Sequence, residues 1–216
     1  MSDGLNGLYK LGGISFMASG SLFLGKTVLE LMTGSPPSSG AEILAWTASR
    51  ELLLAITNEV FFFAVMFLVP AVIALHGSLA RTHRSHAAIG CGIMAVTIPG
   101  LYVLAIVHGR LVFPVFHIRV HTPEVAELVV AIYYGGLHAV AILLAVATFA
   151  LSLAMRRGAY GSTIAYLGFA TAAFDLMGAY PDVMGPILGL VSGIFFAAWF
   201  VAVGFRLYRM PAAVQS

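Results

Sequence analysis

The chain alternates between long apolar runs and short polar connections. Six of the runs are long enough to cross a bilayer as helices, since about 20 residues at ~1.5 Å each span a ~30 Å hydrocarbon core. Proline, glycine and charged residues are concentrated between the runs. This pattern predicts an all-α integral membrane bundle of six transmembrane helices, a single domain over residues 1–216, with spans at about 8–32, 46–75, 87–108, 123–155, 162–179 and 186–208.

Local sequence signals mark several helix boundaries. The proline-rich segment 35–39 cannot continue a helix and ends the first span. Ser39 and Glu42 fit a capping box, so the second helix is expected to begin well before its apolar part and to run on into it. Residues 122–124, Thr-Pro-Glu, fit the first positions of the fourth span. The third span is expected to break near Pro99.

Composition supports the membrane assignment. Of the 216 residues, 60% are hydrophobic and only 9% are charged, whereas soluble domains carry roughly 25% charged residues. Lipid is therefore the expected solvent and the expected partner. The net charge of +2 provides no nucleic-acid surface, and a lone cysteine, Cys91, cannot form an internal disulfide. The first apolar run is expected to be retained, because it lacks a basic n-region and a cleavage site.

The distribution of lysine and arginine predicts the orientation. Cytoplasmic segments of membrane proteins are rich in these residues. With six spans, one side of the bundle holds Lys10, Arg81, Arg84, Arg156, Arg157, Arg206 and Arg209, and the other holds Lys26, Arg50, Arg110 and Arg119. We therefore expect a multi-pass protein of the inner or plasma membrane with both termini in the cytoplasm.

The acidic residues lie almost entirely in the other, outer half of the predicted bundle. Asp3 is the exception, and the remainder are Glu30, Glu42, Glu51, Glu59, Glu124, Glu127, Asp175 and Asp182. Ionisable groups inside hydrocarbon are costly and usually face a protein interior or a wet cavity. The sequence thus predicts an intramembrane polar pocket that opens to the outside or laterally into the outer leaflet.

Three predicted spans contribute polar residues to this pocket. The second span carries Glu51, Asn58 and Glu59 within an apolar run. In the fourth span, Glu127, Tyr134 and His138 follow one another at +7 and +11, which places them on one helix face. The fifth span contains Asp175. We expect these groups, with Glu59 the deepest acid of the second span, to face the interior, while Phe61 and Phe62 face lipid or neighbouring helices.

These residues suit acid–base chemistry on a lipophilic molecule. Two carboxyl groups in a poorly solvated site tend to differ in protonation state, so that one can donate a proton. The catalytic candidates are Glu59, Asp175, Glu127, His138 and Tyr134, and the substrate-binding candidates are Glu51, Asn58, Glu30, Arg50 and His108. The alternative is a buried polar network that only holds helices together.

Lys26 and Glu30 lie four residues apart near the end of the first span, so they share a helix face. Two interpretations are open. The pair can snorkel to the membrane interface, as lysine commonly does, or it can line the mouth of the pocket.

Neither a metal nor a haem cofactor is expected. A bis-histidine haem needs two histidines at similar depth on facing helices, and His76, His108 and His138 fall at different depths. The segment 117–124 has an HxxxH…E spacing. That spacing would bind a metal only on one continuous helix, and the start signal of the fourth span at residue 122 falls inside the segment.

Several segments carry family resemblances. Through residues 42–46, 58–59 and 68–75, the chain resembles bacterial multi-span membrane proteins classed as a domain of unknown function. This resemblance implies a multi-span fold and no particular chemistry. The chain also has a fainter resemblance to integral-membrane terpene cyclases, which are small helical bundles whose intramembrane acids protonate a prenyl epoxide or alkene. This resemblance would imply an isoprenoid substrate.

Three functions remain open from the sequence. The first is a membrane enzyme that uses Glu59 or Asp175 in acid–base chemistry on an isoprenoid- or lipid-like substrate. The second is a protein that binds or transports a small molecule, a proton or a cation. The third is a non-catalytic subunit of a larger complex or a homo-oligomer.

Overall fold

The computed structural model describes residues 2–210, with the side chains of 2–5 and 181–184 outside the description. Within this range the chain is all-helical, as predicted, and the helices are α1 (Ser2–Thr33), α2 (Gly40–Ser49), α3 (Glu51–Leu79), α4 (Arg84–Gly109), α5 (Pro123–Met155), α6 (Ser162–Gly178) and α7 (Pro181–Tyr208). Five segments are long and apolar enough to cross a membrane: Asn6–Thr33, Glu51–Leu79, Arg84–Gly109, Pro123–Met155 and Gly185–Tyr208. α6, with 17 residues, is shorter.

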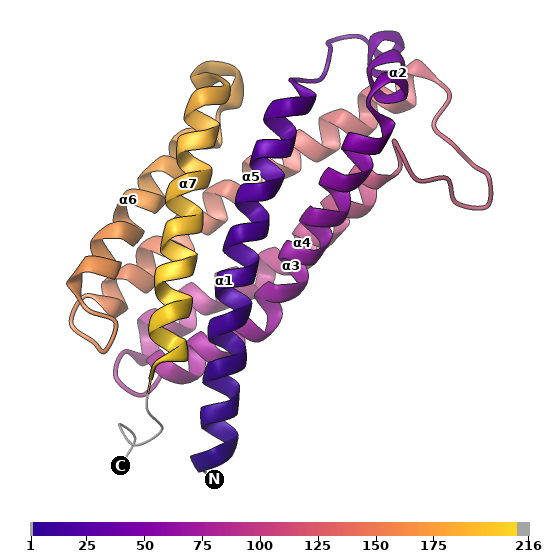
Figure 1. Cartoon of the computed structure of the whole chain (residues 1–216). Helices are drawn as coiled ribbons and strands as arrows, with labels where there is room; N and C mark the ends of the chain where they lie inside the picture. Colours follow the sequence, from indigo (N-terminus) through magenta and orange to yellow (C-terminus); the bar gives the residue numbers. More distant parts are fainter. Residues whose placement is uncertain (1, 211–216) are drawn as a thin grey trace.

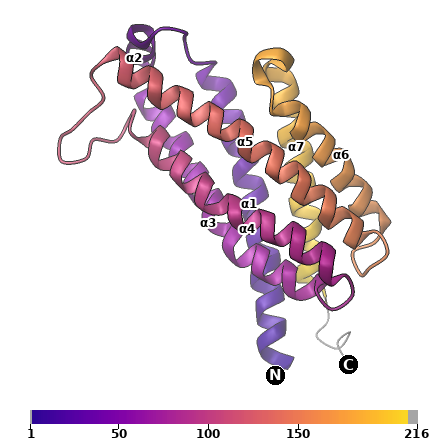
Figure 2. The same ribbon diagram turned by 180° about the vertical axis from the view of Figure 1, so that it is seen from behind.

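The long helices and α6 form a closed ring. Each contacts the next in the order α1, α3, α4, α5, α6, α7, and α7 packs back against α1. Successive members of the ring run in opposite directions, so that α1 begins and α7 ends at the same end of the bundle (Figure 1). We call this the basic end, after Lys10, Arg81, Arg84, Arg156, Arg157, Arg206 and Arg209, and the half remote from it the acidic half. α2 lies across the acidic half's end, against α5 and α3 (Figure 2).

The second predicted helix is broken, which corrects the expectation of one continuous helix from the capping box into the apolar run. Ser39 caps as predicted, accepting a hydrogen bond from the Glu42 amide. Arg50 then leaves the helical conformation (φ −130°, ψ 21°), and α2 and α3 are separate helices. The break lets α2 fold over the ring, where the Trp46 indole donates to the Thr33 carbonyl at 3.1 Å.

The proline in the third predicted span does not break it. α4 continues through Pro99 from Arg84 to Gly109. The non-helical residue lies instead in α7, where Gly185 has a φ of 72°. This left-handed conformation suits glycine because it has no Cβ.

Glycines bring α1 and α7 into close contact in the basic half. A Cβ placed on Gly13 would lie 2.6 Å from the Gly204 carbonyl oxygen, and one on Gly204 would lie 2.5 Å from the Gly13 carbonyl oxygen. The two backbones therefore touch, as small residues permit in membrane helix pairs. Large side chains fill the ring beside this crossing, including the fully buried Phe16, Trp199 and Phe200.

Gly204→Ala should destabilise the protein by about 1–3 kcal/mol, because the added methyl group meets backbone that cannot move aside without separating the helices. Thermal unfolding of the purified protein in one detergent measures the effect. Gly92→Ala is the matched control, since its Cβ would meet nothing within 4 Å. Equal melting temperatures for the two variants would contradict close α1–α7 packing.

Candidate functional site

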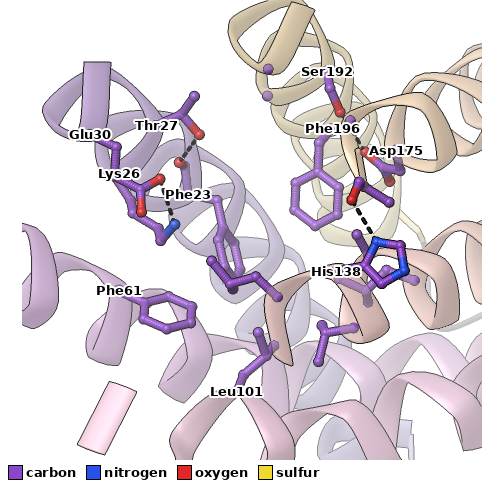
Figure 3. A pocket seen from close by; sticks show the side chains of 18 of the residues that line it. Phe23, Lys26, Thr27, Glu30, Phe61, Leu101, His138, Asp175, Ser192 and Phe196 are labelled. Atoms are coloured by element: carbon purple, nitrogen blue, oxygen red, sulfur yellow. Dashed lines mark hydrogen bonds and ion pairs between the residues drawn. The ribbon is translucent and has the colours of Figure 1, made fainter. Parts of the chain in front are cut away.

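A pocket of about 280 Å³ lies inside the ring, in the acidic half, and all six ring helices contribute to its lining. Most of its surface is apolar, provided by side chains that include Phe23, Phe61, Leu101, Leu144 and Phe196. The charged residues, with two further polar side chains, lie in two walls that face each other across these apolar side chains (Figure 3).

The first wall is the Lys26–Glu30 ion pair on α1. Lys26 Nζ lies 2.7 Å from Glu30 Oε2, and Lys26 is only 7% exposed. The ammonium group also lies over two rings, 5.1 Å from the Phe61 centroid and 5.8 Å from that of Tyr133. A cation over aromatic faces is electrostatically favourable. Of the two interpretations of this pair, the structure supports pocket lining, because Lys26 is buried inside the ring.

A polar network continues from this pair through the bundle. The Tyr133 hydroxyl donates to Glu30 Oε1 at 3.1 Å, and the Tyr133 and His108 ring centroids are 4.4 Å apart. His108 Nδ1 lies 3.1 Å from Asn58 Oδ1, so that Nδ1 carries the proton. We call these residues, from Lys26 to Asn58, the Lys26–Asn58 network. It joins α1, α5, α4 and α3 through side chains alone.

The second wall is formed by Asp175 on α6, Ser192 on α7 and His138 on α5. Ser192 Oγ donates to Asp175 Oδ1 at 3.0 Å. Asp175 is 7% exposed, and its Oδ2 has no hydrogen-bond partner among the described residues. Buried carboxyl oxygens normally have partners, so Oδ2 is an unmet hydrogen-bonding position on a residue that lines the pocket.

His138 is held by the connection that follows α6. Its Nδ1 lies 2.6 Å from the Ala179 carbonyl oxygen, which can only accept, so Nδ1 carries a proton. A neutral ring then has its lone pair on Nε2. His138 therefore offers a base in the same wall as the Asp175 carboxyl group.

The structure brings together some of the predicted site residues. Asp175, His138, Tyr134 and Glu30 line the pocket. His108 and Asn58 are buried in the Lys26–Asn58 network behind it. These residues come from five different helices, so the pocket depends on closure of the whole ring.

Glu59 lies on the outer surface of the ring, contrary to the expectation that it faces the interior. It is exposed and borders a shallow groove with Leu22, Ile56 and Phe113. Adjacent helical residues point about 100° apart, and here Asn58 is buried while Glu59 points outward.

The other acids expected to face inward also lie outside the pocket. Glu51 is about half-exposed at the start of α3, with Oε1 3.4 Å from Arg119 Nη1. Glu127 shares its helix face with Tyr134 but lies about 10 Å further along α5, where it is exposed and accepts a 2.6 Å hydrogen bond from the Gly40 amide. It therefore attaches α2 to α5. Arg50 is exposed at the break between α2 and α3.

Sequence reasoning missed several pocket residues. It assigned no role to Tyr133, which donates to Glu30, and it placed Phe61 against lipid or neighbouring helices, where Phe61 packs against Phe23 of α1 and also lines the pocket. It also missed Gly189, Ser192 and Gly193 on α7. Their i, i+3, i+4 spacing of small residues was an available signal, since such a stripe leaves space beside a helix.

No cluster suited to a metal ion occurs in the described part of the chain, where no three His, Cys, Asp or Glu side chains converge. His117 and His121 belong to the non-helical connection between α4 and α5, which contains an isolated bridge between Val115 and Ile118. His117 has a φ of 66° there, so the HxxxH spacing is not on a helix.

No family model matches the chain, and comparisons with curated proteins and with solved structures found no significant match. The pocket itself offers a buried ion pair, a carboxyl oxygen without a partner and an imidazole lone pair in a largely apolar lining. Such a site suits a small molecule with an apolar body and a polar group.

Glu30→Gln should destabilise the protein by about 3 kcal/mol, because it leaves the Lys26 ammonium buried without a counter-ion. Replacing both partners, Lys26→Met with Glu30→Gln, should cost less than this single change. A double-mutant cycle of thermal unfolding measures the coupling. Glu42→Gln, on the exposed surface of α2, controls for the loss of a carboxylate. Additive losses would contradict the buried pair.

Proposed function

We propose that this is a six-span membrane protein that binds a small amphiphilic molecule inside the ring, and that Asp175 and His138 exchange protons with the ligand's polar group. The observation that carries the proposal is Asp175 Oδ2, a buried carboxyl oxygen with no partner among the described residues, on a residue that lines the pocket. A ligand hydroxyl or amine would supply the missing hydrogen bond.

The proposed ligand has an extended apolar part. Between the two polar walls the pocket presents aromatic and aliphatic side chains, among them Phe23, Phe196 and Leu144. The hydrogen-bonding groups of a fully polar solute would lie against these apolar side chains without partners, which would cost free energy on binding. An isoprenoid- or lipid-like molecule has the matching chemistry, and the surrounding bilayer concentrates molecules of that kind.

Acid–base chemistry is the reaction we propose for such a ligand. Asp175 can donate or accept a proton at Oδ2, and His138 can accept one at Nε2. The Tyr134 hydroxyl group belongs to the same lining. Glu59 and Glu127 are excluded from this role because both are exposed outside the pocket.

Binding or catalysis is favoured over passage through the membrane. The polar walls belong to the acidic half, whereas the basic half of the ring is filled by large side chains such as Phe16, Leu75 and Trp199, each under 2% exposed. Ligand entry from one face of the membrane accords with that asymmetry.

For the topology, we propose that α1, α3, α4, α5, α6 and α7 all cross the membrane, with both termini in the cytoplasm of a cell-membrane protein. The basic end, where α1 begins and α7 ends, supports this orientation (Figure 1). The proposal includes α6, whose 17 residues span about 26 Å.

Single-cysteine variants test the topology. With Cys91 replaced by alanine, Ser38→Cys should react with an impermeant thiol reagent added outside intact cells, and Ser85→Cys should react only after permeabilisation. Both serines are exposed, so their accessibility depends on the side of the membrane. If only Ser85→Cys were labelled from outside, the orientation would be the opposite of the one proposed.

Asp175→Asn should reduce the amount of the amphiphile that copurifies with the protein by at least about tenfold, as expected for a lost hydrogen bond to a charged or buried group. Unbiased lipid and metabolite mass spectrometry of wild type and variant measures the loss. Ser192 Oγ can still donate to the remaining amide oxygen, so folding should persist.

Glu124→Gln is the matched control, because Glu124 is exposed at the start of α5 and does not line the pocket. Identical mass spectra for wild type and both variants would contradict ligand binding at Asp175.

A further inference from the structure

A second pocket, of about 230 Å³, lies at the basic end. The end of α3 and the turn after it, the connection between α5 and α6, the last turn of α7 and Tyr9 of α1 surround it. These segments gather at the end where α1 begins and α7 ends (Figure 2). It is separate from the pocket that contains Asp175, because the two have no lining residue in common.

Positive charge dominates the rim of this second pocket. Three arginines, Arg81, Arg206 and Arg209, line it, and its described lining contains no carboxylate. Guanidinium groups that line one pocket favour an anion, and their planar forks match the oxygens of a phosphate group.

Two of these guanidinium groups are already oriented. Arg206 Nε donates to the Ala159 carbonyl at 2.6 Å, and neither of its terminal nitrogens forms a hydrogen bond to a described residue. The Arg209 guanidinium carbon lies 4.0 Å from the Phe205 ring centroid. Such contacts reduce the rotamer freedom that would be lost when an anion binds.

The hydroxyl groups of Ser78 and Tyr160 in the same lining add no negative charge. Ser78 Oγ donates to the Leu75 carbonyl at 2.8 Å, so the Tyr160 hydroxyl donates to Ser78 Oγ across 2.6 Å. Burial raises the pKa of the Tyr160 phenol above its usual range, so this hydroxyl group stays neutral. The arginines therefore set the sign of the site.

We infer that the pocket at the basic end binds a phosphate group, carried either by an anionic phospholipid or by a soluble phosphate. Its place at the ends of membrane-crossing helices is the level of lipid headgroups, where basic pockets between helices recognise anionic lipids. Tyr9, Leu79 and Met210 provide apolar surface in the same lining, against which the glycerol and upper acyl region of a lipid would pack.

Native mass spectrometry of the full-length protein in detergent tests this inference, with phosphatidylglycerol and phosphatidylcholine of identical acyl chains as probes. Wild type should retain phosphatidylglycerol preferentially. Arg206→Gln with Arg209→Gln should weaken its binding by about 25-fold, at about fivefold for each arginine. Arg209→Gln alone keeps the Arg206–Ala159 hydrogen bond, so it reports on charge without loosening the α5–α6 connection.

Arg156→Gln with Arg157→Gln is the matched control, since both residues are exposed at the same end and neither lines the pocket. Preference for phosphatidylglycerol that is lost only in the pocket variants supports a lipid ligand. Arginine-dependent binding of added inorganic phosphate, with no preference between the two lipids, supports a soluble phosphate. Equal losses in pocket and control variants, or no binding of any phosphate probe, would overturn the inference.

Discussion

A charged group buried inside a membrane protein must find its counter-charge within the protein, and in this chain that constraint centres on Lys26. Its ammonium group is held by Glu30 and by the faces of Phe61 and Tyr133, which belong to three different helices. Tyr133 and His108 carry the polar contacts on to Asn58. The relative positions of α1, α3, α4 and α5 therefore depend on one satisfied ion pair.

The two halves of the ring use different means of association. In the basic half, α1 and α7 meet backbone to backbone at Gly13 and Gly204, and large side chains fill the remaining space. In the acidic half, polar side chains hold the helices across a hollow interior. Tight packing in the basic half thus supports a pocket in the acidic half. Dispersion contacts in the basic half hold the six helices together, so the acidic half need not be filled with side chains.

The helical fold could be predicted from the sequence because apolar runs and capping residues act locally. The Ser39 cap and the start of α5 at Pro123 illustrate this. The break at Arg50 could not be predicted, since no glycine or proline marks it and the contacts of α2 are mainly with α5, which is remote in the sequence. The choice between Asn58 and Glu59 is similar, because only the neighbouring helices determine which of two adjacent residues faces inward.

In the candidate site, Asp175, His138 and Glu30 could be found as ionisable groups in apolar surroundings. Ser192 and its neighbours Gly189 and Gly193 could not be found that way, because they contribute mainly the absence of bulk. A methyl group on Gly189 would meet nothing within 4 Å. α7 therefore determines how large a ligand fits the pocket, while α5 and α6 determine which polar group of the ligand is bound. Substitutions on α7 can thus change the range of ligand sizes and leave the polar contacts from α5 and α6 unchanged.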